Sequence, residues 1–165
     1  MFHKSMIAGL LALVLAVPAL AETRIGVVDL RQALFSSEDA QVFSEKLQRD
    51  FSGDEADVRR AQEDARKMKE RLERDGAMMN ESERNRLAAE FQEKVKEFNF
   101  LKQRLDSTIA SRKQSFLENA RPEVDRAVQE LLDENNLDLI LPSEAVVYAK
   151  PAMDLTSQLL DKLNR

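Results

Sequence analysis

The stretch Arg74–Arg84, RDGAMMNESER, contains Gly76, the last glycine of the chain. A glycine favours the position just after a helix end, and Asn80 followed by Glu83 has the spacing of a capping box that starts a helix. Both signals interrupt sequence that is otherwise helical and highly charged. The stretch therefore predicts that one long helix ends, that the chain turns at residues 76–80, and that a second helix begins.

The lengths on either side of the turn predict an antiparallel hairpin. The first helix is expected at Glu38–Asp75 and the second at Glu81–Arg121. At a rise of 1.5 Å per residue they span roughly 57 and 62 Å. Two helices of matched length joined by a short turn fold back on each other, so residues 38–121 are predicted to form one arm.

Apolar residues recur at alternating spacings of three and four along both helices, which is the pattern of a coiled-coil seam. Polar Asp54 interrupts this seam in the first helix, and Arg112 interrupts it in the second. The seam residues are Ala40, Phe43, Leu47, Phe51, Val58, Ala61, Ala65, Met68 and Leu72, followed by Leu87, Phe91, Val95, Phe98, Leu101, Leu105, Ile109, Phe116 and Ala120.

Residues before the arm predict a short buried strand within TRIGVVDL, from Thr23, and then a helical turn through Leu34 and Phe35. Ser36 and Asp39, three residues apart, are expected to cap the start of the first long helix. These residues form the first part of a small body.

Residues after the arm complete this body. Pro122 should kink or restart the second helix, because proline removes a backbone donor. LDLIL and AVVYA, separated by Pro142, predict a β-hairpin of buried strands, and Asp154 is expected to cap a final helix. The fold class is therefore α+β, with a three-stranded body made of residues 22–37 and 122–165.

The size of the body predicts oligomerisation. The two segments of the body together have 60 residues. A domain of that length buries only about 60% of the surface that its unfolded chain exposes. It must also anchor a thin arm, and its strand edges would be open. Association through the sheet would relieve both deficits.

The N-terminus reads as a signal peptide at residues 1–21. His3 and Lys4 precede an apolar run that is too short to span a bilayer, and Ala19 and Ala21 form the small-x-small cleavage pattern. We expect cleavage after Ala21 and export of the chain.

The composition argues against an enzyme and predicts no cofactor or metal. His3 is the only histidine and the chain has no cysteine, so the exported chain would have no disulfide, no thiol nucleophile and no histidine base. The glycines do not form a phosphate-binding loop. Nucleic-acid binding is disfavoured by export and by a net charge of −5.

The chain resembles the Skp (OmpH-like) family of periplasmic chaperones. The resemblance rests on RIGVVDLRQALF, the charged helical hairpin, LDLILPSEAVVYA and the closing DLTSQLLDKL. It implies a homotrimer whose strands form a common β-barrel body, with three arms around a cavity. It also implies ATP-independent holding of unfolded outer-membrane β-barrel proteins in the periplasm. The candidates for the oligomer core are Ile25, Val27, Leu139, Leu141, Val146 and Tyr148.

The charges are distributed unevenly, although the chain is acidic overall. The outer arm, Arg59–Lys113, has 15 basic and 11 acidic residues. The body is acidic, and so is the inner arm, which is Glu38–Val58 and Gln114–Arg121. Positive outer arms would steer an acidic client by long-range attraction. Pairing along a solvated helix explains most of these charges individually. The resemblance also implies contact with lipopolysaccharide or phospholipid at the outer arm, without assigning residues.

Three residues are candidates for client contact. Met78 and Met79 lie at the tip of the predicted arm, and methionine adapts to varied apolar partners. One of them alone would be explained by covering the end of the hairpin core. Phe100 should point away from the seam that contains Phe98, as a lone aromatic among charged residues.

A structural or adaptor protein that binds a folded partner through a coiled coil is the alternative. That function predicts an uninterrupted seam and a defined apolar stripe for the partner. The seam is interrupted at Asp54 and Arg112, and the outer surface is charged rather than striped. These features leave the adaptor and the chaperone nearly even, and the family resemblance is what favours the chaperone.

Overall fold

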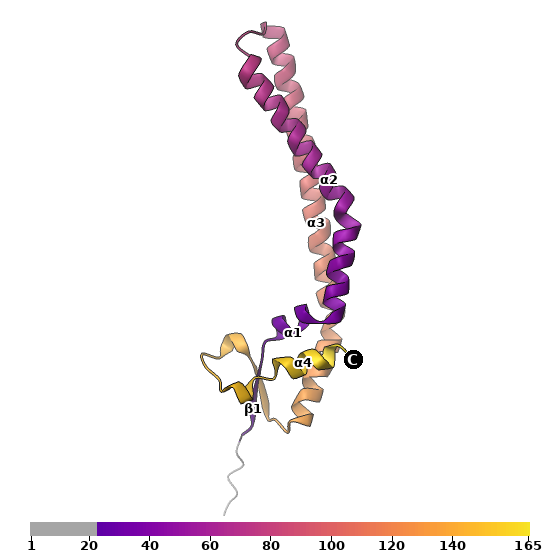
Figure 1. The fold of residues 1–165 in the computed structure, drawn as a ribbon, viewed down its shortest axis with the longest axis vertical. Coiled ribbons are helices and arrows are strands. Elements are labelled where there is room, and N and C mark those ends of the chain that lie inside the picture. Colours follow the sequence, from indigo (N-terminus) through magenta and orange to yellow (C-terminus); the bar gives the residue numbers. More distant parts are fainter. Residues whose placement is uncertain (1–22) are drawn as a thin grey trace, which may run out of the picture.

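The computed structural model describes residues 23–165 and shows a long two-helix arm on a small α/β body (Figure 1). The predicted signal peptide lies outside the described residues. The elements are β1 (Ile25–Val28), α1 (Leu30–Ser36), α2 (Glu38–Asp75), α3 (Glu81–Glu134), β2 (Leu139–Pro142) and α4 (Thr156–Leu163), with 3₁₀ turns at Ser143–Ala145 and Pro151–Met153. The described part of the chain is mostly helical.

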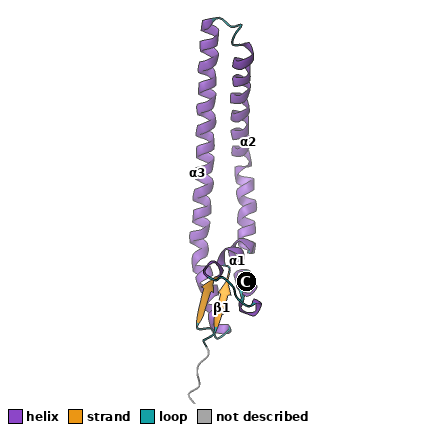
Figure 2. Cartoon of the chain, turned by 90° about the vertical axis from the view of Figure 1, so that its left-hand side faces the viewer, coloured by secondary structure: helices purple, strands orange, loops and turns teal. Residues whose placement is uncertain are grey.

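The arm has the predicted antiparallel geometry, and α2 and α3 lie side by side along its length (Figure 2). Helix α2 has the predicted bounds, and α3 begins at the predicted residue. Asn80 accepts a hydrogen bond from the Glu83 N–H, while the Glu83 carboxylate accepts one from the Asn80 N–H, so the capping box is confirmed. Gly76 follows α2 directly, and a Cβ there would overlap the carbonyl oxygen of Leu72.

Two helix boundaries differ from the predictions. Ser37 rather than Ser36 caps α2, because Ser36 belongs to α1 and the extended backbone of Ser37 lets its hydroxyl accept from the Ala40 N–H. Pro122 lies inside α3 without ending it. The turns beyond it are held by the body, into which Ala127 and Leu131 are packed.

The sheet has two parallel strands, with Ile25 paired to Leu139 and Val28 to Pro142. The predicted β-hairpin and third strand are therefore wrong for the described chain. After β2 a 3₁₀ turn leads the chain away, and Val147 and Tyr148 are 105% and 82% exposed. An isolated bridge joins Val27 of β1 to Asp154 instead.

The core of the body lies where α3, α4, α1 and β1 meet. Leu131 of α3 and Leu159 of α4 are completely buried, and Val28 is nearly so. Gly26 leaves room for this packing, since a Cβ would come within 2.7 Å of the Leu155 side chain. The Asp154 carboxylate accepts from the Thr156 N–H at 2.9 Å, but the N-cap of α4 is Leu155, so the predicted cap lies one residue too early. The body therefore anchors the arm through the last turns of α3.

A buried cation also joins α4 to α3. The Lys162 ammonium lies 2.8 Å from Glu134 and 3.6 Å from Glu130, and the Lys162 side chain is only 3% exposed. Contact with this ammonium lowers the pKa of the Glu134 carboxyl. The carboxylates are themselves about half exposed, so water screens the two ion pairs.

Leu131→Ala should lower the free energy of unfolding by about 2–5 kcal/mol, because the Leu131 side chain is fully buried and its removal leaves a cavity in the core. Urea unfolding followed by circular dichroism at fixed protein concentration measures this loss. Val42→Ala, at a side chain that is 60% exposed, is the control and should cost far less. Equal losses in the two variants would contradict the assigned core.

Glu134→Gln should remove stability at neutral pH and progressively less as the solution is acidified. The folded-state pKa of Glu134 is lowered, so its contribution is present above the unfolded-state pKa of about 4.3 and is lost as pH falls through the folded value. Thermal unfolding from pH 7 to pH 3 measures the difference, with Glu144→Gln as an exposed control. A difference that grows on acidification would contradict the ion pair.

Candidate functional site

The junction of arm and body is closed by an aromatic stack between the two long helices. The rings of Phe43 in α2 and Phe116 in α3 lie with centroids 4.5 Å apart and planes 16° from parallel. Both residues belong to the predicted seam. The stack forms a wall shared by two surface hollows.

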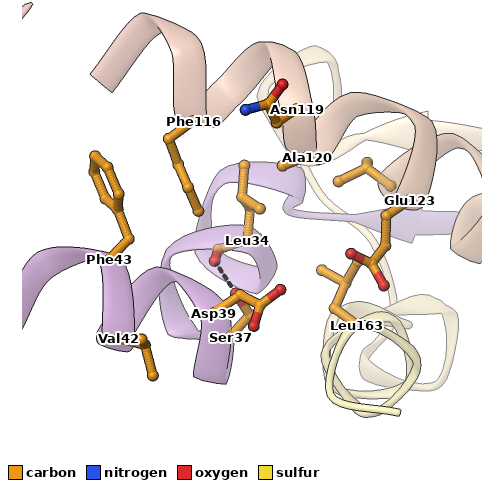
Figure 3. A pocket seen from close by; sticks show the side chains of 11 residues that line it. Leu34, Ser37, Asp39, Val42, Phe43, Phe116, Asn119, Ala120, Glu123 and Leu163 are labelled. Atoms are coloured by element: carbon orange, nitrogen blue, oxygen red, sulfur yellow. Dashed lines mark hydrogen bonds between the residues drawn. The ribbon is translucent and has the colours of Figure 1, made fainter. Parts of the chain in front are cut away.

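The first hollow, which we call the acidic hollow, has a volume of about 270 Å³ and is lined by Asp39 and Glu123 among apolar side chains. Figure 3 shows these carboxylates beside Leu34 and Leu163, with the Ser37 hydroxyl donating to the Leu34 carbonyl at 2.7 Å. Its walls come from α1, α2, α3 and α4. It therefore lies where the arm meets the body.

The second hollow, which we call the Lys113 hollow, has a volume of about 360 Å³. Its lining includes no carboxylate. It is lined by Phe35, Ala40, Phe43, Ser44, Leu47, Lys113, Phe116 and Leu117. The two hollows thus share an aromatic wall but differ in the sign of the charge beside it.

A polar interaction crosses the seam farther along the arm. Arg104 of α3 donates to Asp54 of α2 at 3.1 Å, so the predicted polar interruption at Asp54 has a partner. The same guanidinium lies 6.0 Å from the centroid of the Phe100 ring, within cation–π range. Arg112, the other interruption, is exposed. Of the ion pairs among residues 23–165, only Asp54–Arg104 joins α2 to α3.

The candidate client-contact residues lie on the arm in different environments. Met78 is 83% exposed at the tip, whereas Met79 is half-buried and lines a shallow hollow with Leu87. Phe100 is 63% exposed on α3. The three residues do not form one patch, because Phe100 lies many turns from the tip. Met78 and Phe100 are the two large apolar side chains that the outer arm offers to solvent.

The charged side chains of the arm are mostly paired within their own helix. Examples are Arg66 with Glu70 at 3.1 Å and Arg86 with Glu90 at 3.0 Å. Lys67 lowers the pKa of the Glu63 carboxyl by hydrogen bonding. Such exposed pairs contribute little to stability. They keep the arm surface hydrophilic, with the excess of positive charge on the outer arm that the sequence predicts.

The oligomer-core candidates are split between the interior and the surface of the body. Val27 is buried and Ile25, Leu141 and Val146 are half-buried, whereas Leu139 is 44% exposed. Tyr148 projects into solvent with Val147 beside it. The sequence predicted buried strands for both segments, and it showed neither the exposure of Val147 and Tyr148 nor the pairing of β2 with β1.

Among residues 23–165, no three His, Cys, Asp or Glu side chains come together as a group suited to a metal ion. No helix in this range is both long and apolar enough to cross a membrane.

This architecture defines the class of protein: an α+β protein with a small body and a long, charged helical-hairpin arm. Residues 24–163 match the model of the family described as outer membrane protein (OmpH-like). The chain belongs to this family, which confirms the resemblance found in the sequence.

Relatives of known sequence support this assignment over nearly the full chain. A Skp-like protein of Pseudomonas aeruginosa is 26% identical over 155 residues, covering 93% of this chain and 92% of the relative. The chaperone protein Skp of Vibrio cholerae is 24% identical over 140 residues, covering 85% and 83%.

A solved structure supports the fold. It is described as a putative outer membrane chaperone (OmpH-like) from Caulobacter crescentus, with a TM-score of 0.62 and 16% identity, covering 99% of this chain and 90% of that one.

Replacing Asp54 and Arg104 separately and together by alanine should reveal a coupling of about 0.2–1 kcal/mol, because the pair is half exposed. The coupling should shrink between about 0.05 and 1 M salt as the charges are screened. Urea unfolding of the four proteins in the cycle gives both values. A coupling that is absent at low salt would contradict a stabilising link across the seam.

Proposed function

We propose that this protein is a periplasmic chaperone that holds unfolded outer-membrane β-barrel proteins without ATP and prevents their aggregation before membrane insertion. The observation that carries the proposal is the family match of residues 24–163, together with relatives named as Skp chaperones. In this proposal the chain is exported by cleavage after Ala21 and acts as a binding protein rather than an enzyme.

The proposed assembly is a homotrimer. Residues 22–37 and 122–165 form the body of each subunit, and residues 38–121 form its arm. The exposed apolar segment at Val147 and Tyr148 and the half-exposed Leu139 would be covered by association, since such a patch is otherwise left in water. Strands of three copies would then complete a common barrel.

The arm surface suits many weak contacts rather than one tight site. Its charged side chains leave Met78 and Phe100 as isolated apolar contacts. Three arms that act together multiply such weak contacts into useful affinity, and each contact still exchanges quickly. The positive outer arm attracts acidic clients, and contact with lipopolysaccharide or phospholipid would use the same charge.

The mature protein mixed with a urea-unfolded outer-membrane β-barrel should keep that barrel soluble after dilution. Size-exclusion chromatography with light scattering should give the mass of three chains plus one client. A barrel that precipitates while the protein elutes unchanged would contradict the chaperone function. The adaptor function would then be tested with folded partners.

The double variant Met78→Ser and Phe100→Ser should weaken client binding about tenfold, because two exposed apolar contacts are lost. Competition with a labelled unfolded barrel measures the affinity. The matched control is Ala77→Ser with Asn99→Ser, which changes exposed neighbours in the same turns. Equal affinities of the two double variants would exclude Met78 and Phe100 as client contacts.

A further inference from the structure

The Lys113 hollow is an apolar recess that the packing of α1, α2 and α3 leaves partly open. Two of its lining side chains, Phe35 at 57% and Leu117 at 40%, stay substantially exposed. Its volume of about 360 Å³ is at the small end of the range of roughly 300–1,000 Å³ for ligand sites. It therefore fits one or two side chains rather than a folded element.

The lysine at this hollow differs from most other cations of α3. Lys94, Lys102 and Arg121 each pair with a carboxylate three or four residues away. The corresponding neighbours of Lys113 are Ile109, Ala110, Phe116 and Leu117, none of which is charged. Within residues 23–165 the Lys113 ammonium has no ion-pair partner, and no carboxylate lines the hollow.

The acidic hollow on the other side of the aromatic stack supplies the contrast. Asp39 and Glu123 line it, so it would repel a carboxylate that the Lys113 hollow would attract. The two sites present similar apolar walls, because Phe43 and Phe116 belong to both. The charge beside the wall is thus what would distinguish their ligands.

We propose that the Lys113 hollow anchors one kind of client segment: an extended chain with an apolar side chain followed two residues later by a carboxylate. In an extended chain, side chains at i and i+2 point to the same face, about 6.6 Å apart. The apolar side chain enters between Phe35 and Leu117, and the carboxylate pairs with the Lys113 ammonium. This proposal rests on the proposed function, since it assigns a contact for the unfolded client.

The charge of the hollow favours such a segment over a purely apolar one. An apolar side chain alone would leave the lysine unpaired, whereas an aspartate or glutamate at i+2 gives it a partner beside the contact. The acidic surface of the inner arm around the hollow would repel carboxylates elsewhere, so the pairing fixes the register of the segment. The site therefore distinguishes client segments by the spacing between the apolar residue and the carboxylate as well as by their composition.

The test uses the full mature protein and short fluorescent peptides that differ at one position. The parent peptide is Gly-Ser-Phe-Ser-Asp-Ser-Gly, compared with peptides that have Asn or Lys in place of Asp and with one in which Asp directly follows Phe. Fluorescence anisotropy gives their affinities, and the NMR methyl signals of Leu117 and Leu47 report binding in the hollow.

The Phe-Ser-Asp peptide should bind about two- to fivefold more tightly than its Asn and Phe-Asp counterparts, as expected for one exposed ion pair. Lys113→Gln should abolish this preference, and Lys113→Glu should reverse it in favour of the Lys peptide. Lys46→Gln is the matched control, because Lys46 is an exposed cation of the inner arm that lines neither hollow. It should leave the preference unchanged.

Three results would overturn the proposal. The first is equal binding of all peptides, or an unchanged preference in Lys113→Gln. The second is a change of assembly mass in Lys113→Glu, which would make the hollow an interface between copies. The third is a response of the Leu117 signals to anionic lipid vesicles but not to peptides. If the protein keeps an unfolded barrel soluble in the same preparation, these results reject the hollow and leave the proposed function intact.

Discussion

The arm consists of two helices without a third partner, and this constraint governs the rest of the structure. Each helix can bury only one stripe, so every other face must be compatible with water. The stripe is held at its base by the stack of Phe43 on Phe116 and farther out by the pair of Asp54 with Arg104. The small core around Leu131 then connects the arm to the strands. Few of residues 23–165 are buried, and most of those lie on this seam or in this core.

The same constraint determines what the arm can bind. A surface that must stay hydrophilic cannot present a broad apolar site, so apolar contacts occur singly, as at Met78 and Phe100, or in a gap between helices. Such contacts are individually weak and tolerate different sequences, which suits the proposed holding of unfolded chains. The Lys113 hollow is where the packing at the base of the arm leaves apolar wall uncovered. Charge beside that wall would add selectivity that the open arm surface lacks.

The arm could be predicted from the sequence because its signals are local. Asn80 and Glu83 cap one helix, Gly76 ends the other, and the heptad pattern reports the seam. The body could not be predicted as well, because β2 pairs with β1, which lies more than a hundred residues earlier in the sequence. Tyr148, which was expected in a buried strand, is instead exposed in the described chain. The Arg104 contact and the hollows depend on the register of α2 against α3. One available signal was missed: the four helical neighbours of Lys113 are all apolar.

Hydrogen–deuterium exchange with and without a bound, unfolded outer-membrane barrel tests the central claim that the arm surface holds the client. The account predicts new protection of amides in α2 and α3, including the tip near Met78, and little change in β1, β2 and α4. Protection confined to residues 139–149 with an unchanged arm would contradict it. The client would then be held by the body, and the charged arm would serve another purpose.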